Sequence, residues 1–472
     1  MSEQSKKLGL FSLIALVVSS SVGAGIFSIS SDLALGAAPG PALIAWLIVG
    51  AGILMLSLSF NNLLNKKPEL NGIFSYAEAG FGKFGGFLSG WGYWLSAWLG
   101  NVAFATMLMS TLAYFFPVFG DGQNIPSIIG ASILMWLLTF IVNRGVEEAA
   151  VINTLVTLFK LIPIFTFIVI GIFAFKFDLF TIHFWGNFKD NITVSNVLDQ
   201  VKSCVMVMMW VFVGIEGASM LSSRAKSKKI AGKATILGLI GLLVIYVLAS
   251  IIPYGLLSRD QLMNLPTPSM AYILKDVIGD FGATFINIGL IISILGSWLS
   301  WTMLPAETTL LMARSNLLPK IFGKTNKAGS PTFSLILTAG LTQLFIFTFL
   351  FTDKAYNFAY SLCTAAILIC YLFVGLYQTK LSFQNRCEKG EIKQLIVGII
   401  AAGFQLFAIL ASGIQYTLLC FIAYIPGIVF FYVAKKENGK KGLSKNEILL
   451  TILIIIGALY AVYLVTAGKV TV

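Results

Sequence analysis

The sequence predicts an all-α polytopic membrane protein, on three observations. Of its 472 residues, 57% are hydrophobic and only 11% are charged, whereas soluble domains are about 25% charged. The mean hydropathy is +0.89. Apolar runs of about 20 residues recur along the whole chain, and each is long enough to cross a hydrocarbon core of about 30 Å. The runs are continuous rather than alternating, so they favour helices over the strands of a barrel.

The apolar runs predict thirteen transmembrane helices in one large membrane domain. They lie near residues 9–31, 41–62, 85–116, 126–143, 148–175, 196–221, 230–256, 281–312, 332–351, 357–378, 393–412, 415–434 and 447–467. The division between the eleventh and twelfth rests on Ala411, Ser412 and Gly413 alone. The N-terminal run lacks a clear cleavage site and continues beyond signal-peptide length, so we expect it to be a retained helix.

The distribution of positive charge predicts the orientation of the chain. The formal net charge is +12. With a cytoplasmic N-terminus, 24 of the 32 Lys and Arg residues fall in cytoplasmic segments and seven in outer ones. Such an excess of Lys and Arg is typical of cytoplasmic loops in membrane proteins. It accounts for the positive net charge, so we expect no binding of nucleic acid. Thirteen spans then place the C-terminus outside a cell inner (plasma) membrane.

Several function classes receive no support from the residues. The five cysteines form no CxxC pair and the chain has a single histidine, His183, so we expect no metal site, no cofactor and no disulfide framework. The spans contain no nucleophile–base pair, which argues against an enzyme. Charged rings of the kind found in channels are also missing from the pattern.

Two of the predicted helices are interrupted by glycine. The first contains Gly23 and Gly25, and the sixth contains Gly214 and Gly217 around Glu216. Helices 1 and 6 occupy equivalent positions in two five-helix halves, and paired interruptions of this kind indicate a transport site at the bilayer midplane. The alternative is that these glycines only allow close helix packing.

Two charged residues fall inside predicted spans. Glu216 is the carboxylate nearest the middle of a span, and intramembrane acids are usually functional; we expect a proton-sensing or gating role, with a structural hydrogen bond as the alternative. Lys160 on helix 5 is too deep to reach the interface easily. Its ammonium group is placed to take the position of a coupling cation near the helix 1 interruption, with a packing salt bridge as the alternative.

Tryptophans are concentrated on helices 3, 6 and 8. Aromatic faces in a low-dielectric cavity bind ammonium and guanidinium groups, so an uncharged cage for a cation is one interpretation. An aromatic belt at the membrane interface is the other. The residues concerned are Trp91, Trp94 and Trp98, followed by Asn101, on helix 3, Trp210 on helix 6, and Trp298 and Trp301 on helix 8.

With these residues, the sequence resembles the amino acid–polyamine–organocation superfamily. Within it, the chain is most similar to the basic amino acid/polyamine antiporters, especially bacterial arginine/ornithine antiporters. The segments that carry the resemblance are SSVGAGIF (20–27), YWLSAWLGN (93–101), NRGVEEAAVINTLVTLFKLIPI (143–164), WVFVGIEGAS (210–219), LGSWLSWTML (295–304) and LLPKIFGKTNKAGSP (317–331).

The resemblance implies a LeuT-like 5+5 inverted repeat with broken helices 1 and 6. The expected division is a cytoplasmic tail (1–8), a first repeat (9–175), a second repeat (196–380), helices 11 and 12 (393–434) and an extra helix 13 (447–467).

The resemblance also implies roles for residues of the substrate site. The backbone of Ala24, Gly25 and Ile26 would receive the substrate carboxylate at the start of a half-helix. The carbonyl groups expected to accept from its ammonium lie near Ser21, Trp210 and Val213. Many relatives carry Gly-Ser-Gly where this chain has Gly23-Ala24-Gly25, so here only backbone donors remain.

The substrate's side chain has its own expected partners. Trp301 would stack on the cationic group and Asn101 would hydrogen-bond it, while Trp210 and Glu216 would act in gating. Lys160 resembles the lysine that replaces sodium in sodium-independent relatives. The remaining expected substrate-binding residues are Ala97, Phe104, Cys363 and Thr364.

The function implied is a secondary antiporter that exchanges arginine for ornithine. The alternatives are exchange of an amino acid for its decarboxylation product (arginine/agmatine or histidine/histamine), or a proton-coupled basic amino acid permease. The expected partners are small basic amino acids or polyamines and the lipid bilayer, with no nucleic acid; a homodimer is left open.

Overall fold

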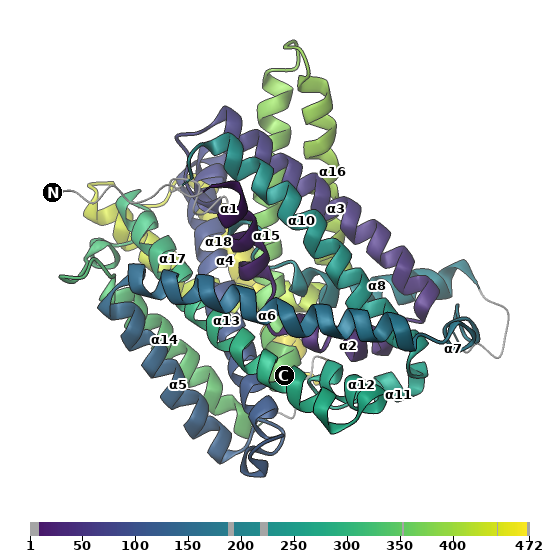
Figure 1. The fold of residues 1–472 in the computed structure, drawn as a ribbon. Coiled ribbons are helices and arrows are strands. Elements are labelled where there is room, and N and C mark those ends of the chain that lie inside the picture. The colour runs from purple at the N-terminus through teal and green to yellow at the C-terminus, as the bar shows by residue number, and fades with distance from the viewer. Residues whose placement is uncertain (1–8, 187–192, 218–224, 352–353, 441, 470–472) are drawn as a thin grey trace.

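The structure is a computed structural model that describes residues 9–186, 193–217, 225–351, 354–440 and 442–469. Helices make up most of these ranges (Figure 1). In chain order up to residue 217 they are α1 (Leu10–Ser21), α2 (Ile29–Gly36), α3 (Pro39–Lys66), α4 (Ile73–Leu112), α5 (Ile125–Arg144), α6 (Val146–Ala174), α7 (Phe177–Thr181) and α8 (Val194–Val211).

The helices after residue 225 complete the fold. They are α10 (Lys228–Ile251), α11 (Arg259–Met263), α12 (Ser269–Ile278), α13 (Asp280–Arg314), α14 (Thr332–Ile346), α15 (Ala355–Gln384), α16 (Glu391–Ala411), α17 (Ile414–Glu437) and α18 (Lys445–Thr466). Local sequence sets several ends: Ser444 and Glu447 form a capping box at the start of α18, and Gly413, with φ of 94°, separates α16 from α17.

Within the described residues, ten helices are long and apolar enough to cross a membrane. They coincide with ten of the thirteen predicted runs. Of the other three, the first is divided between α1 and α2, and the fifth is α6, whose described apolar part is Phe159–Ala174. The sixth is helical from Val194 to Val211, and its last predicted residues, 218–221, lie outside the described residues. The count of thirteen therefore stays a prediction.

The chain leaves helical geometry at both places where the sequence has paired glycines. α1 ends at Ser21, Val22 is extended, and a single 3-10 turn, η1 (Gly25–Phe27), leads into α2. α8 ends at Val211 and is followed by turns in which Gly214 has φ of 107°. A residue with a side chain is strained at that φ.

α4 and α15 form the centre of the molecule. In their most apolar stretches, 89% of the residues of α4 and 78% of those of α15 are buried, against 22% in α18. α4 packs against both α15 and α13. Glycines allow the close contact with α15: a Cβ at Gly92 would lie 3.1 Å from the Sγ atom of Cys370. The two central helices are thus enclosed by other parts of the protein, whereas α18 lies at the periphery.

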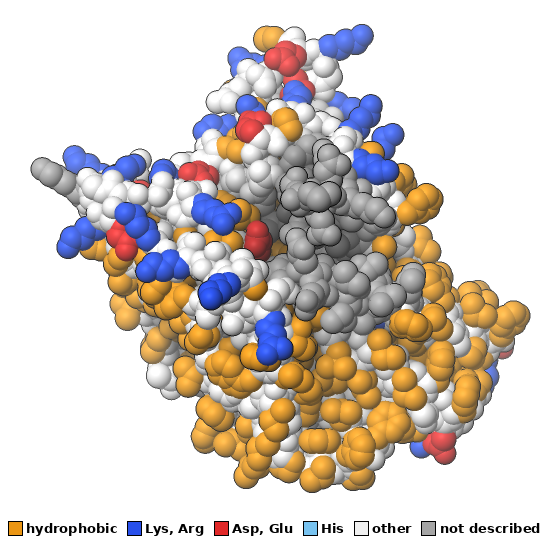
Figure 2. Space-filling view, turned by 60° about the vertical axis from the view of Figure 1, so that its left-hand side comes forward, with side chains coloured by type: hydrophobic (Ala, Val, Ile, Leu, Met, Phe, Trp, Pro, Cys, Tyr) orange, Lys and Arg blue, Asp and Glu red, His pale blue; other side chains and the backbone are white. Residues whose placement is uncertain are grey.

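Positive side chains gather at one end of the molecule, above a wide apolar surface (Figure 2). The α3–α4, α13–α14, α15–α16 and α17–α18 connections carry them. Ion pairs tie neighbouring helices together there: Lys66 pairs with Glu391, and Lys435 with Glu447 at 2.5 Å. We call this end the basic face. The apolar surface below it is what a bilayer would cover.

Candidate functional site

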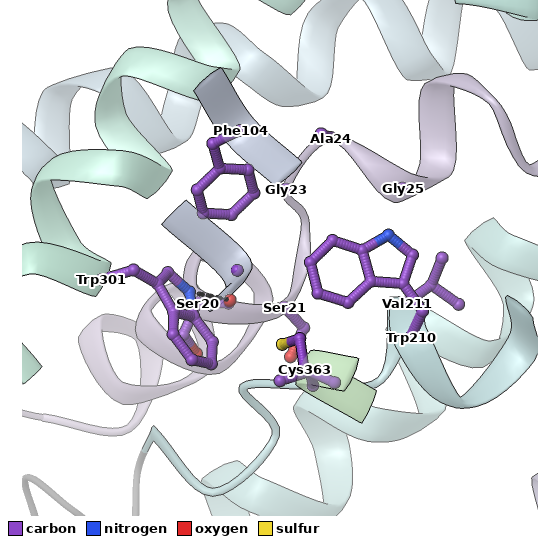
Figure 3. Close-up of a pocket in the computed structure, with 12 residues that line it drawn as sticks. Ser20, Ser21, Gly23, Ala24, Gly25, Phe104, Trp210, Val211, Trp301 and Cys363 are labelled. Atoms are coloured by element: carbon purple, nitrogen blue, oxygen red, sulfur yellow. Dashed lines mark hydrogen bonds between the residues drawn. The ribbon is translucent and has the colours of Figure 1, made fainter. Parts of the chain in front are cut away.

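A small cavity lies at the interruption between α1 and α2 (Figure 3). Its free space is about 10 Å³, close to the least that holds one water molecule. It is lined by Ser20, Ser21, Gly23, Ala24, Gly25, Gly100, Phe104, Trp210, Val211, Val213, Trp301 and Cys363. The lining thus joins α1, α4, α8, α13 and α15, and it contains no charged side chain.

The glycines of the interruption let aromatic rings approach the backbone. A Cβ at Gly25 would lie 2.6 Å from Nε1 of Trp210, and a Cβ at Gly23 would lie 3.0 Å from the ring of Phe104. Figure 3 shows both rings beside this stretch of chain. The glycines therefore determine how closely the cavity closes.

Backbone donors at the interruption are available to an anion. The N–H groups of Ala24, Gly25 and Ile26 donate no hydrogen bond to any described residue. These groups belong to the first turn of η1, where the partial positive charge of a helix start adds to their effect. The arrangement suits a carboxylate or another small anion.

Trp301 and Asn101 are joined on the α13 side of the cavity. Nε1 of Trp301 donates to the carbonyl oxygen of Ser20 at 3.3 Å (Figure 3). Asn101 Nδ2 donates to the carbonyl oxygen of Trp301 at 3.2 Å. The Oδ1 atom of Asn101 is buried without a partner among the described residues, so it offers one acceptor close to the backbone of Trp301.

Trp210 closes the cavity on the α15 side. Its Nε1 donates to the hydroxyl of Tyr356 at 3.3 Å, and its ring stacks on Tyr360 with centroids 5.8 Å apart. The ring of Phe104 is 6.3 Å away on α4. Neither tyrosine lines the cavity. Trp210 therefore lies between the cavity and the tyrosine pair.

Glu216 lies outside the cavity lining and connects α15 to the α8 interruption. Its Oε2 accepts from the hydroxyl of Tyr371 at 2.6 Å and from the N–H of Gly214 at 3.2 Å. The carbonyl oxygen of Gly214 in turn accepts from Ser20 Oγ at 2.7 Å. A continuous set of hydrogen bonds thus links the carboxylate to the end of α1.

Lys160 is fully buried against the other side of the α1 interruption. Its Nζ donates to the carbonyl oxygen of Val22 at 2.8 Å and to Ser297 Oγ at 3.5 Å. Ser297 Oγ also donates to the Val22 carbonyl oxygen, at 3.3 Å. The ammonium group therefore lies where α1 loses its helical hydrogen bonds.

Comparison with known proteins decides the family. Residues 8–415 match the family described as amino acid permease. The chain belongs to the amino acid permease family. A protein of Latilactobacillus sakei named arginine/ornithine antiporter is 62% identical over 468 residues, which cover 99% of this chain and 98% of that protein.

More distant relatives carry two kinds of name. An arginine/ornithine antiporter of Lactococcus lactis subsp. cremoris is 46% identical, covering 98% of the permease and 90% of that protein. An arginine/agmatine antiporter of Chlamydia pneumoniae is 38% identical, covering 99% of both chains. The permease is therefore a multi-pass membrane protein similar over its whole length to antiporters.

The structure brings most of the predicted substrate-binding residues to the permease's cavity. Eight of them line it: Ser21, Ala24, Gly25, Phe104, Trp210, Val213, Trp301 and Cys363. Ile26, Ala97, Asn101 and Thr364 are buried nearby but not in the lining. Thr364 Oγ1 donates to the carbonyl oxygen of Tyr360 at 2.7 Å, so it supports the tyrosine pair.

The tryptophans of predicted helix 3 lie neither at the protein surface nor in the cavity lining. Trp91 and Trp94 are 1% exposed and Trp98 is 8% exposed, so they form no interfacial belt, and none of them lines the cavity. Trp91 Nε1 donates to the carbonyl oxygen of Ala423, and Trp94 Nε1 to Thr338 Oγ1, each at 2.9 Å. They are packing residues between α4, α14 and α17.

Sequence reasoning did not assign some residues to the substrate site. Ser20, Gly23, Gly100 and Val211 complete the lining, and Tyr371 holds Glu216. The signal for Gly100 was its lack of a side chain one residue before Asn101: a Cβ there would lie 3.4 Å from Cys363 Sγ. Among the described residues, no group of three or more His, Cys, Asp or Glu side chains could hold a metal ion.

Proposed function

We propose that the permease exchanges cationic amino acids across the cytoplasmic membrane by alternating access, taking arginine inward and ornithine outward. The carrying observation is the set of unpaired backbone N–H groups at Ala24, Gly25 and Ile26, which adjoins an uncharged cavity walled by Trp210 and Trp301. Amides at a helix start bind a carboxylate, and aromatic faces bind a cation without trapping it. An amino acid with a cationic side chain has both groups.

The proposal includes a 5+5 inverted repeat, residues 9–175 and 196–380, and thirteen spans with the basic face in the cytoplasm. Its support is the pair of non-helical segments after α1 and α8, one in each half. The Ser20–Gly214 hydrogen bond joins the last turn of α1 to the segment after α8. Transporters built on such repeats place substrates at discontinuous helices.

Lys160 and Glu216 take separate roles in the proposal. The Lys160 ammonium substitutes for a coupling sodium ion by filling the acceptor site at the Val22 carbonyl oxygen, so exchange needs no sodium. Glu216 acts as a gate residue, because its hydrogen bonds to Tyr371 and Gly214 join α15 to the α8 interruption. Breaking them would free the two elements from each other.

Substrate binding requires movement of the lining. A space of about 10 Å³ does not hold an amino acid. Displacement of Trp210 would enlarge it, because Trp210 lines the cavity and contacts both Tyr356 and Tyr360 on its other side. We therefore assign Trp210 the role of a gate between the cavity and the face opposite the basic one.

Exchange of arginine for agmatine is the second candidate, since the 38% identical relative bears that name. The backbone N–H donors favour an exchange in which both the imported and the exported substrate carry a carboxylate, and agmatine has none. Exchange of histidine for histamine has the same disadvantage. A proton-coupled permease would not require a substrate on the opposite side.

Membrane potential separates these candidates. Arginine and ornithine each carry a net charge of +1, whereas agmatine carries +2, and each charge moved is worth about 2.3 kcal/mol per 100 mV. In proteoliposomes loaded with ornithine, agmatine or histamine, we expect ornithine to drive arginine uptake best. We also expect a potassium potential imposed with valinomycin to leave the rate unchanged. Faster uptake with agmatine, at a rate that follows the potential, would contradict the proposal.

A further inference from the structure

A groove at the periphery of the fold takes no part in the proposed exchange. Its free space is about 340 Å³, against about 10 Å³ in the cavity at the α1 interruption. Residues of α4, α15, α16, α17 and α18 line it. A dry apolar cavity of about 150 Å³ is large enough to bind benzene, so this groove has room for a stretch of hydrocarbon chain.

The lining of the groove is almost wholly apolar. It consists of Leu, Ile and Phe side chains apart from Thr417 and Tyr424. The hydroxyl of Tyr424 already donates to the carbonyl oxygen of Leu88 at 2.9 Å, so water would find few partners there. Leu376 and Leu453 of the lining remain exposed. The groove therefore opens outward, onto the apolar surface that a bilayer would cover.

The groove exists because α18 packs mainly on α17 rather than on the centre of the fold. Gly457 brings these two helices together, since a Cβ there would lie 2.6 Å from the ring of Phe421. Nearer the basic face, the Lys435–Glu447 ion pair joins them again. The two contacts fix α18 to α17, and the space left between α18 and α15 is the groove.

One end of the groove leads to a positive side chain. The ring of Phe373, in the lining, lies 5.5 Å from the ring of Phe81 on α4, measured between centroids. Lys380 Nζ lies 5.6 Å from the centroid of Phe81 and donates to the carbonyl oxygen of Gly80 at 2.6 Å. Lys380 is about one helical turn beyond Leu376, toward the basic face.

The ammonium group of Lys380 is available to an anion. Its side chain is exposed, and it forms no ion pair with a carboxylate in the part of the chain that the structure describes. An ammonium group has three N–H donors, so the hydrogen bond to Gly80 leaves donors for a second partner. The groove thus combines an apolar channel open to the bilayer with a cation at its basic-face end.

We propose that the groove between α15, α17 and α18 binds one acyl chain of an anionic glycerophospholipid from the leaflet at the basic face, with the headgroup phosphate on Lys380. An empty groove would leave its walls without contacts on one side, and the bilayer supplies chains that fill it. The tail does not select a lipid, because lipid tails are as apolar as leucine. Selection comes from the headgroup, since a lysine near the membrane surface attracts anionic lipids.

A second copy of the chain is the other occupant that such a groove admits. A copy in the same membrane orientation would set a second basic face beside the first, which places like charges together. The headgroup of an anionic lipid instead brings the opposite charge to Lys380. Charge complementarity therefore favours the lipid, whichever amino acids the permease exchanges.

The test is native mass spectrometry of the full chain, titrated with phosphatidylglycerol or with phosphatidylcholine of the same acyl chains. We expect one phosphatidylglycerol per chain, bound about fivefold more tightly than phosphatidylcholine, the ratio that corresponds to about 1 kcal/mol for one lysine. Lys380→Gln should bind the two lipids equally. Leu376→Trp and Leu453→Trp, which fill the groove from opposite walls, should each release both lipids while eluting as a single species.

The matched controls are Lys393→Gln on α16 and Leu459→Trp on α18, because both residues are exposed and neither lines the groove. Each should bind lipid as wild type does. Equal affinity of the wild type for the two lipids, a preference retained in Lys380→Gln, or unchanged lipid binding in both groove-filling variants would overturn the lipid site. Loss of a dimer in those variants, with lipid still bound, would assign the groove to a second copy instead.

Discussion

The carbonyl oxygen of Ser20 accepts a hydrogen bond from the indole nitrogen of Trp301, 3.3 Å away. The Oγ of the same serine donates to the carbonyl oxygen of Gly214 at 2.7 Å. Ser20 is thus the residue at which the end of α1, the α8 interruption and the aromatic wall of the cavity meet. A movement of α1 cannot leave Trp301 or Gly214 unaffected, which is how a single local change would reach several walls of the site.

Replacement of Trp301 tests the aromatic wall. Trp301→Leu keeps apolar volume but removes the indole face, so we expect arginine binding to weaken by roughly 1–2 kcal/mol, about 5–30-fold. Titration calorimetry on the purified protein measures it. Trp98→Leu is the control, because Trp98 is buried on α4 away from the cavity, and wild-type affinity in Trp301→Leu would reduce Trp301 to a packing residue.

Gly25 is expected to tolerate no side chain. In Gly25→Ala the new methyl group would lie 2.6 Å from Trp210 Nε1, so the indole must move and arginine uptake should fall by about tenfold or more. Gly403→Ala on α16 is the control, since nothing lies within 4 Å of a Cβ there. Equal uptake by the two variants, measured at equal protein in the membrane, would mean that Trp210 does not need to approach α1.

Lys160 is expected to make exchange independent of sodium. Lys160→Ala leaves the Val22 carbonyl oxygen without its ammonium partner, and the loss of a buried charged hydrogen bond costs about 3 kcal/mol. Exchange should collapse although protein still reaches the membrane, as a surface-fraction blot would show. A sodium requirement in the wild type, or full activity in Lys160→Ala, is incompatible with the proposed role.

The Glu216–Tyr371 contact is expected to control the pH dependence of exchange. Glu216→Gln keeps the shape of the side chain but cannot ionise, so the rate should no longer vary with pH where the wild-type rate does. Tyr371→Phe removes the donor at 2.6 Å and should change the rate while a pH dependence remains. The measurement is initial exchange rate against pH; a profile for Glu216→Gln that matches wild type would exclude Glu216 as the proton-sensitive group.

Cysteine labelling tests the orientation. Cys387 is the exposed native cysteine, in the α15–α16 connection on the basic face, and the other four are buried. In intact cells we expect an impermeant thiol reagent to leave Cys387 unlabelled and to label Lys469→Cys after Cys387→Ser. Lack of labelling at Cys387 would show that the basic face is cytoplasmic. Labelling of Lys469→Cys would show that the C-terminal end is external. Labelling of Cys387 from outside would reverse the proposed topology, and protection of Lys469→Cys would remove the thirteenth span.

The sequence by itself determined the membrane class, most of the spanning helices and the places where α1 and α8 end. The reason is that length and apolarity against a bilayer are properties of each segment alone, and paired glycines such as Gly23 and Gly25 lower the cost of leaving a helix locally. The short boundary at Ala411–Gly413 was predictable for the same reason, and the structure confirms it.

Only the tertiary structure decided which side chains of those helices face the cavity. Trp98 and Trp301 carry the same ring in similar apolar surroundings, yet Trp98 packs between helices and Trp301 lines the cavity. The partner of Glu216, Tyr371, is 155 positions away along the chain. A hydropathy pattern records how apolar a helix face is but not which helix covers it, and that choice is made by packing between segments far apart in sequence.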